Sequence, residues 1–579
     1  MSDITACPLD CYDACKIIYE QGKLKGVIKG YTKGFLCPHM NHYDKYQTIL
    51  KPRYKGEEVS LEEALEYLKK ILISSNKDKI LHYRGSGNFA LMQEISDHFF
   101  ASYGAVLTNG NLCDGAGEAG IQKGRGSNLN MPLSEIEKSQ VVIFWGRNPH
   151  TTSSHILPLV KDKTIIVIDP IKIKIAKKAD LYVQLKPHGD LAFALLLSHF
   201  LYVQNGIDKE YLKKYAKGHK DFCKLIQNIK VQTTLQNIDV TLIQIYNLLD
   251  LIKGKRVAIV CGVGIQKYKD GADVIRAIDA FAVMLGLFVK EGCGVAYLGN
   301  SKDKITLPFN TKAKKVSRVN TKFSNFKTVF IQGANPLSQM PDTLRVRESM
   351  KKVQKIIYFG LYENETSQMA DLVIPAKSFL YKNDVRTSYS HNAMMFMPKV
   401  ADIDVGISEY DLSTYLCREF DLEIEDEDFY INYFKEQAIL KSDECFEVKN
   451  RKIIPYKNGF DTLDKQFVFL KEFDINFKKD KDFFLITPKS SSSLNSQFKR
   501  QEGVYLHSSL GYKEGKKVLI SSLNGTVSLK VRYNDDLRKD TVLIYSGTKG
   551  VNNLTSSQHS LDGTNAVYQE DMVEIFRDN

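Results

Sequence analysis

Four cysteines lie within the first 37 residues, and their spacing constrains this chain more than any other feature of its sequence. Cys7, Cys11 and Cys15 follow one another at intervals of four, and Cys37 comes after Gly34-Phe35-Leu36. The segment up to about residue 41 is rich in cysteine and glycine but short of apolar runs. A hydrophobic core therefore cannot hold it together, whereas a bound metal cluster can supply the missing stability.

Three interpretations of this cysteine pattern compete. Three closely spaced thiolates and a fourth from a distant turn suit a 4Fe–4S cubane, in which each iron takes one cysteine sulfur. Structural zinc fits less well, because zinc sites usually pair their ligands as two C-x-x-C knuckles. A helix that buries the cysteines along one face fits least, because the charged residues Asp10, Asp13 and Lys16 leave the cysteines few apolar neighbours. We predict an iron–sulfur cluster ligated by Cys7, Cys11, Cys15 and Cys37.

The bulk composition is that of an ordinary globular protein. The chain has 579 residues, 43% of them hydrophobic and 26% charged, which predicts roughly two to four core-forming units. The net charge of +12 favours acidic ligands or an acidic partner surface. No arginine-rich helix, aromatic–basic platform or zinc-finger spacing is present, so we expect no binding of nucleic acid.

The start of the chain and its cysteine usage predict a cytoplasmic location. The sequence runs straight into the cysteine motif, without a charged region followed by an apolar one and without twin arginines. The most apolar stretch, 191–203, is too short to span a bilayer, so we expect a buried helix and no direct membrane insertion. In a reducing compartment, clustered cysteines indicate metal ligation rather than disulfides.

From about residue 60 the pattern alternates between helix and strand. Residues 61–73 have helical periodicity and begin with Ser60 and Glu63 at capping-box spacing, and 275–285 is also helical. Continuous apolar runs are typical of parallel strands buried on both faces; they cover 79–83, 141–145, 164–168, 256–260, 328–331 and 356–360. Turn residues follow each run, at the sheet edge where open α/β sheets bind ligands.

The sequence pattern changes near the end of the chain. Residues 421–480 are strongly charged and aromatic, and no pattern assigns them. Five short strands follow, which together predict a compact C-terminal β-barrel; they are 483–487, 504–507, 517–521, 525–533 and 541–545.

Several motifs, in a shared order over nearly the whole chain, resemble those of the molybdopterin oxidoreductases of the dimethyl sulfoxide reductase type. The opening carries Ala6-Cys7-Pro8-Leu9-Asp10-Cys11-Tyr12-Asp13-Ala14-Cys15 and Gly34-Phe35-Leu36-Cys37-Pro38. Later motifs are Gly85-Ser86-Gly87-Asn88, Asn111-Leu112-Cys113-Asp114-Gly115-Ala116-Gly117, Trp145-Gly146-Arg147-Asn148-Pro149, Asp169-Pro170, His188-Gly189-Asp190, Asn335-Pro336, Ala370-Asp371-Leu372-Val373-Ile374-Pro375-Ala376 and Thr487-Pro488-Lys489.

This resemblance implies a multi-domain α/β fold with split doubly wound sheets. It places a 4Fe–4S domain at 1–48, two interleaved α/β domains that bind pterin dinucleotides at 49–480, and a molybdopterin-type β-barrel at 481–579. It also implies two molybdopterin guanine dinucleotides that chelate one molybdenum or tungsten ion. Glycine-rich loops with exposed backbone amides and a positive net charge are compatible with such anionic ligands.

Three residues stand where the resemblance implies the reaction centre. Cys113 matches the side chain that ligates the metal, a role that suits a soft thiolate; the alternative is a buried thiol in a glycine-rich loop. Asp114 stands where formate dehydrogenases of the family carry histidine, which argues against formate as substrate. Its carboxylate is either a proton acceptor or donor beside the metal, or a cap of the following turn. His39 stands where the family usually has a lysine between cluster and pterin, and its charge is conditional near neutral pH.

The resemblance also implies the pterin dinucleotide contacts. Asp169 and Asp190 match carboxylates that read guanine or ribose edges, although turn formation or helix capping would explain them as well. The other contacts, for which ordinary turn chemistry is the alternative, are Gly87, Asn88, Asn148, Gly262, Gly264, Asn335, Pro336, Thr487, Asn495 and Asn552.

The implied function is two-electron oxo transfer or hydroxylation of a small substrate, with electrons passing through one cluster to a partner protein or subunit, as in anaerobic metabolism. The chain is compact for the family, which favours a small substrate. One alternative is a non-redox hydratase or transhydroxylase on the same scaffold. Another is a non-catalytic electron-relay subunit, against which Cys113 and the strand-end loops argue.

Overall fold

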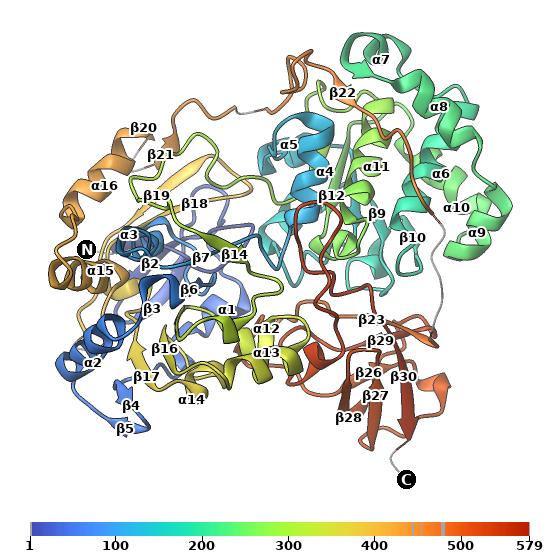
Figure 1. The fold of residues 1–579 in the computed structure, drawn as a ribbon. Coiled ribbons are helices and arrows are strands. Elements are labelled where there is room, and N and C mark those ends of the chain that lie inside the picture. The colour runs from blue at the N-terminus through green and yellow to red at the C-terminus, as the bar shows by residue number, and fades with distance from the viewer. Residues whose placement is uncertain (1–2, 404, 443–444, 453, 476–480, 578–579) are drawn as a thin grey trace. The chain divides into compact units, whose positions relative to one another are not determined.

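The chain forms two compact units, each assembled from separate segments of sequence (Figure 1). The computed structural model describes residues 3–403, 405–442, 445–452, 454–475 and 481–577. The first unit contains Met1–Gly110, Ser301–Arg451 and Ser491–Arg500. The second contains Asn111–Asn300, Lys452–Ser490 and Gln501–Asn579. The mixed α/β fold is as predicted, while the proposed division into four domains stays a prediction.

A six-stranded sheet forms the centre of the first unit. Its order is β5 (Glu57–Glu58), β4 (Arg53–Tyr54), β17 (Leu372–Pro375), β16 (Lys355–Gly360), β15 (Thr328–Gln332) and β6 (Ile80–Arg84). The last four strands are parallel, and β15 is buried along its whole length. The apolar runs therefore formed buried parallel strands, as their composition predicts.

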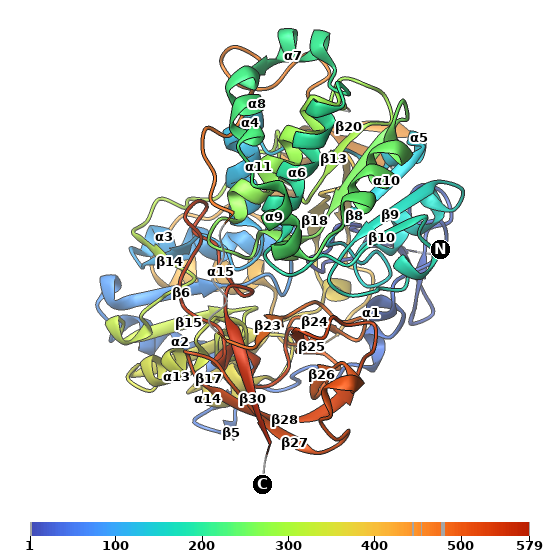
Figure 2. The ribbon, with the colours of Figure 1, turned by 90° about the vertical axis from the view of Figure 1, so that its right-hand side faces the viewer.

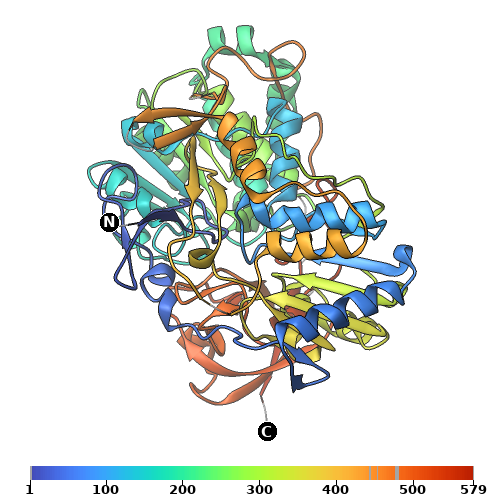
Figure 3. The ribbon, with the colours of Figure 1, turned by 90° about the vertical axis from the view of Figure 1, so that its left-hand side faces the viewer.

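Helices α2 (Leu61–Ile73), α3 (Ile95–Tyr103) and α15 (Glu409–Glu419) share one hydrophobic core with this sheet. Figure 3 shows the orange helix α15 beside the blue helix α3. Ser60 accepts a hydrogen bond from the Glu63 backbone N–H, and the Glu63 carboxylate accepts one from the Ser60 N–H. The predicted capping box therefore begins α2.

The N-terminal segment folds as an antiparallel sheet of β1 (Asp3–Ala6), β2 (Lys16–Glu20) and β3 (Lys23–Gly26). A second antiparallel sheet has the order β18 (Asp384–Thr387), β19 (Ala393–Met397), β21 (Cys445–Val448) and β20 (Ala438–Ser442). Ala6 and Ile17 of the first sheet pack in one core with Met395 and Met397 of the second. Helix α16 (Glu427–Glu436), β20 and β21 lie in the stretch that sequence patterns left unassigned.

A five-stranded, fully parallel sheet forms the centre of the second unit. Its order is β10 (Leu181–Val183), β9 (Thr164–Ile168), β8 (Val141–Trp145), β12 (Val257–Cys261) and β13 (Gly294–Ala296). Helix α11 (Gly271–Met284) contacts both α4 (Gly115–Arg125) and α6 (Asp190–Val203), which lie near it in Figure 2. The apolar stretch 191–203 is thus a buried helix, as predicted.

Six strands close a barrel near the end of the second unit (Figure 1). Their order is β23 (Phe483–Ile486), β29 (Thr541–Leu543), β26 (Val504–Leu506), β28 (Thr526–Tyr533), β27 (Lys517–Ser521) and β30 (Met572–Arg577). The first five match the predicted strands. Sequence patterns missed β30, which pairs with both β23 and β27 and so closes the barrel.

Among the described residues, no helix combines the length and the apolarity that crossing a membrane requires. Helix α6, the most apolar candidate by sequence, has 14 residues.

Helix α4 approaches α11 closely because residue 120 is glycine. A Cβ atom built on Gly120 would lie 2.2 Å from the backbone carbonyl oxygen of Ala272 in α11. Only a backbone or helix shift would make room for it, since that neighbour is main chain rather than a flexible side chain.

Gly120→Ala should therefore lower the free energy of unfolding by about 1–3 kcal/mol, the usual cost of overpacking. Thermal and urea unfolding would measure the change. Gln122→Ala, at an exposed position of the same helix, is the control and should leave stability nearly unchanged. Equal stability of the two variants would show that α4 and α11 do not pack as described.

Candidate functional site

The first three cysteines lie in and beside the loop between β1 and β2. Cys7 directly follows β1, Cys15 directly precedes β2, and the Cys7 backbone N–H donates to the Cys15 carbonyl at 2.9 Å. Cys37 comes from a separate turn, as the N-cap residue of the short helix α1 (Pro38–Asn41). None of these cysteines forms a disulfide.

The chemistry of these thiols fits an iron cluster. Burial raises the pKa of Cys7 well above its usual range, and the nearby Cys37 and Cys11 raise it further. Burial likewise raises the pKa of Cys15, and Asp13 and the other three cysteines add to the effect. These four cysteines, two of them buried, could all ionise only beside a strongly positive partner, which cubane iron would provide. Backbone N–H groups also point at the sulfurs: Leu9 donates to Cys7, and Met40 and His39 donate to Cys37.

His39 lies beside the fourth cysteine, on α1. Its Nδ1 atom is 4.0 Å from the Cys37 sulfur, and its ring stacks on Phe498 with centroids 5.4 Å apart. The side chain is buried. This position agrees with a residue between cluster and pterin, and that role stays a prediction.

The loop that carries Cys113 is held by one side chain. The Oδ1 atom of Asn111 accepts hydrogen bonds from the backbone N–H groups of Cys113 and Asp114, both at 2.9 Å, and of Gly115 at 3.1 Å. Helix α4 begins at Gly115, so Cys113 lies just before a helix N-terminus. The partial positive charge of that end favours a thiolate over a thiol.

Two neighbouring residues of the second unit complete this loop. The Nε2 atom of Gln266 donates to the Cys113 carbonyl at 2.8 Å, and its Oε1 atom accepts from the Gly117 N–H at 3.0 Å. Lys267 donates to the Leu112 carbonyl at 3.4 Å. Burial lowers the pKa of Lys267, while the adjacent Cys113 raises it. The loop is therefore held by several hydrogen bonds, and the partly buried Lys267 amine lies close to it.

Asp114 is the N-cap residue of α4, yet its side chain accepts no hydrogen bond from the first helical turn. The carboxylate is buried. Capping thus does not explain this residue, and its role as a proton acceptor or donor stays a prediction.

The parallel sheet of the second unit brings several predicted contact residues to one edge. Asn148 follows β8, Asp169 directly follows β9, and Gly262 and Gly264 follow β12. These strands are neighbours in the sheet. A Cβ on Gly262 would lie 1.7 Å from the Gly146 carbonyl oxygen, so two of these loops touch through their backbones.

Two carboxylates near this edge are buried and share one electrostatic environment. Burial raises the pKa of Asp169 to about 7, and Asp190 contributes to that rise. Burial also raises the pKa of Asp190 to about 7. The Trp145 indole N–H, which donates to the Oδ1 atom of Asp190 at 2.7 Å, partly offsets this rise. Each carboxylate would ionise more readily if it accepted further N–H groups, such as those of a guanine edge.

The first unit has a similar edge on its own sheet. The loop after β6, with Gly85, Gly87 and Asn88, lies against the loop after β15, since the Gly87 N–H donates to the Gly333 carbonyl at 3.0 Å. A Cβ on Gly85 or Gly87 would lie 2.5 Å or 2.7 Å from that same carbonyl oxygen. Only glycine allows these loop backbones to approach so closely.

The asparagines of these loops are engaged by acidic side chains. The Nδ2 atom of Asn88 donates to Asp384 and to Glu409, both at 3.2 Å. The Nδ2 atom of Asn335 donates to Glu365 at 2.8 Å, and Arg500 pairs with the same carboxylate. Pro336 opens helix α12 (Pro336–Gln339) at its first position. Any pterin contact by these two asparagines would add to, or replace, these bonds.

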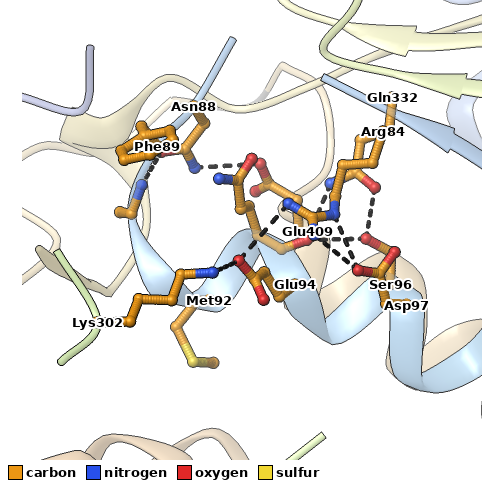
Figure 4. A network of polar contacts seen from close by, with 12 residues as sticks. Arg84, Asn88, Phe89, Met92, Glu94, Ser96, Asp97, Lys302, Gln332 and Glu409 are labelled. Carbon is orange, nitrogen blue, oxygen red and sulfur yellow. Dashed lines mark hydrogen bonds and ion pairs between the residues drawn. The ribbon is translucent and has the colours of Figure 1, made fainter. Parts of the chain in front are cut away.

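Figure 4 shows the charged network beside the Asn88 loop. Arg84 contacts Asp97 at 2.7 Å and Glu94 at 3.7 Å, and Lys302 also pairs with Glu94. Burial lowers the pKa of the Arg84 guanidinium, but Asp97 and Glu94 outweigh that effect and raise it overall. The network stiffens the turn that follows β6.

Three predicted contacts come from the last hundred residues. Thr487 directly follows barrel strand β23. Asn552 lies in the 3-10 helix Val551–Asn553 and is buried. Asn495 lies outside the barrel strands, between β24 (Ser493–Leu494) and β25 (Gln497–Phe498) of the first unit, with a left-handed φ of 52°. Their roles as contacts stay predictions.

Comparisons with known proteins identify relatives along most of the chain. A family model described as molybdopterin oxidoreductase matches residues 50–403. A probable oxidoreductase, YyaE of Bacillus subtilis, is 26% identical over 438 residues, covering 69% of this chain and 66% of its own. Formate dehydrogenase H of Escherichia coli is 23% identical over 475 residues, covering 69% of this chain and 65% of its own. The match thus spans about two thirds of the length of these relatives.

A solved structure shares the fold over the full chain. Acetylene hydratase from Pelobacter acetylenicus aligns with a TM-score of 0.73 at 13% identity, covering 99% of this chain and 100% of that one. The predicted fold class is confirmed by this likeness.

Asn111→Ala should loosen the Cys113 loop, because three backbone N–H groups lose their common acceptor. Each lost bond is worth about 1 kcal/mol, so amide hydrogen exchange at residues 113–115 should accelerate by about tenfold or more. Mass-spectrometric exchange would measure it. Asn111→Asp keeps an acceptor oxygen and should exchange at nearly the parental rate; equal exchange in the alanine variant would contradict the described loop.

Asp169→Asn should stabilise pterin-free protein at pH 8 but not at pH 4. Because the folded-state pKa of Asp169 is raised to about 7 from 3.8, the folded chain binds this proton more tightly than the unfolded chain. The free energy of unfolding of the parent therefore falls between these pH values as pH rises, by an amount on the order of a few kcal/mol.

Urea unfolding at pH 4, 6 and 8, on protein from a host that makes no pterin, would measure this difference. Asp162→Asn, an exposed position just before the same strand, is the control and should show almost no difference at any pH. A stability difference for Asp169→Asn that did not vary with pH would contradict the assigned burial.

Proposed function

Because the chain belongs to the molybdopterin oxidoreductase family, we propose that it is a molybdenum or tungsten enzyme that performs two-electron oxo transfer or hydroxylation on a small substrate. In this proposal it carries two molybdopterin guanine dinucleotides and one 4Fe–4S cluster. The metal would supply the two-electron change that the side chains of a protein cannot.

One observation carries the proposal: Cys113 is presented before the N-terminus of α4 on a loop fixed by Asn111 and Gln266. A partly exposed thiol on a loop held by these hydrogen bonds suits a metal ligand, which must be kept in a fixed direction. The convergent N-terminal thiols and the glycine-rich strand-end loops of both sheets support the same function.

The side chains would divide the work as follows. Cys113 binds the metal as a thiolate, which the helix end and the Lys267 amine favour electrostatically. Asp114, buried and not used as a cap, accepts or donates a proton at the substrate. Asp169 and Asp190 accept N–H groups of a guanine or hydroxyl groups of a ribose. His39 links cluster and pterin through hydrogen bonds.

We infer a substrate other than formate, since Asp114 replaces the histidine that formate dehydrogenases of this family carry. Small sulfur, nitrogen or carbon oxo-compounds fit the proposal. Electrons would pass to or from a separate electron-transfer protein, and a cytoplasmic location remains our expectation. A hydratase or transhydroxylase on the same scaffold is the alternative, and it would turn over without any electron acceptor or donor.

Protein purified without oxygen should contain iron together with molybdenum or tungsten, and its brown colour should bleach with dithionite. Cys113→Ala should abolish dye-linked turnover and remove one sulfur from the metal's coordination, as X-ray absorption would measure, yet leave the cluster spectrum intact. Cys223→Ala, a buried cysteine of the same unit, is the matched control and should stay active. Full activity and unchanged coordination in the Cys113 variant would reject the ligand.

A further inference from the structure

Arg386, on strand β18, is fully buried and directs its guanidinium at the carbonyl groups of the N-terminal cysteine loop. Its terminal nitrogen Nη2 donates to the Leu9 carbonyl at 3.1 Å and to the Cys11 carbonyl at 3.3 Å. Its Nε donates to the Cys7 carbonyl at 3.3 Å. One side chain therefore holds three points of the loop that carries Cys7 and Cys11.

The remaining donors of Arg386 are also used. Nη1 donates to the Phe89 carbonyl at 3.3 Å and to the Thr387 carbonyl at 2.6 Å, and the guanidinium lies 4.9 Å from the centroid of the Phe89 ring. A guanidinium has five N–H donors in a fixed fork, and here each meets a carbonyl oxygen. Lysine, with three donors on a flexible stem, cannot reproduce this arrangement.

Neighbouring residues on the same segment hold the rest of the loop. The Ser388 hydroxyl donates to the Tyr12 carbonyl at 3.1 Å, and the His391 Nε2 atom lies 2.9 Å from the Asp13 carbonyl oxygen. The carbonyls of the loop thus turn toward residues 386–391. Through these hydrogen bonds, residues 386–391 fix the backbone of the cysteine loop.

Arg386 has no direct acidic partner among the described residues, although the buried Asp13 carboxylate of the cysteine loop acts on His391, as Arg386 does. All five of its hydrogen-bond acceptors are neutral carbonyls, and no ion pair joins it to a carboxylate within the described ranges. A fully buried cation is costly unless an anion lies nearby. Four thiolates outweigh the positive charge of cubane iron, so an assembled cluster is anionic and becomes more so on reduction.

We propose that Arg386 is the counter-charge and positioning residue of the iron–sulfur cluster: it fixes the cysteine loop and keeps the reduction potential of the cluster high. This inference rests on the proposed function, because it presumes that the cluster is present. A nearby cation stabilises the reduced, more negative cluster more than the oxidised one. Removing the charge should therefore make the cluster harder to reduce.

The experiment is an anaerobic potentiometric titration of the whole enzyme with dithionite, followed by the paramagnetic resonance of the reduced cluster. Arg386→Met should lower the ratio of reduced to oxidised cluster at a given potential by about tenfold, which is about 59 mV for a one-electron couple. Arg386→Lys keeps the charge but loses the fork. It should titrate close to the parent while losing iron to a chelator at least about threefold faster, because fewer carbonyls of the loop remain held.

Arg318→Met is the matched control, since Arg318 is a partly buried arginine of the first unit that donates to Thr108 and not to the cysteine loop. It should change neither quantity. An Arg386→Met cluster with the parental potential would overturn the counter-charge. If that variant fails to accumulate, the lysine variant decides: parental rates of iron loss would overturn the positioning role. Parent enzyme without iron would instead reject the proposed function itself.

Discussion

The free-energy cost of burying charged groups away from water is a constraint that both units must meet. A buried charge needs an opposite charge or several aligned dipoles close by, and the structure meets that need in different ways. In the second unit Arg125 pairs with Asp279, both almost fully buried. In the first unit Arg84 pairs with Asp97, whereas the hydrogen bonds of Arg386 to described residues all go to carbonyl dipoles. At the sites that we assign to cofactors, the cysteine thiols and the carboxylates of Asp169 and Asp190, burial raises the pKa more than the surrounding protein lowers it.

Much of the fold was predictable because its signals are local. Continuous apolar runs identified the central parallel strands, such as β8 and β15, since strands buried on both faces have no polar side. The capping residues of α2 marked its first turn. Strand β30 was missed for two reasons. Charged residues stand among its apolar residues, and its partner strand β23 lies far away in sequence. In the charged stretch 421–480, helix α16 contacts β18 and strand β21 pairs with β19, and local pattern cannot reveal such distant partners.

In the candidate site, too, sequence patterns suggested some residues and missed others. Cysteine spacing gave the proposed N-terminal ligands, which stay a prediction, whereas turn residues after strands predicted loops that the sheets do bring to their edges. The supporting residues were not predictable: Gln266 reaches a carbonyl 153 positions away, and Arg386 reaches one 377 positions away. Nothing in a single sequence distinguishes such a glutamine or arginine from many others. Arg386 also binds the Phe89 carbonyl, so it ties the cysteine loop to the loop of Gly87 and Asn88.

The discontinuous make-up of the units determines when their long-range contacts can form during synthesis. The cysteine loop is synthesised first, but β18 and the residues that hold this loop follow only after the segment Asn111–Asn300 of the other unit. Nascent chains of this kind expose reactive thiols for many seconds before their long-range contacts form. Iron delivered early would reach the cysteine loop before residues 386–391 are present to hold its backbone. On the proposed function, the cluster would therefore be inserted at a late stage of maturation, after translation has passed residue 391 and the loop can be held by Arg386, Ser388 and His391.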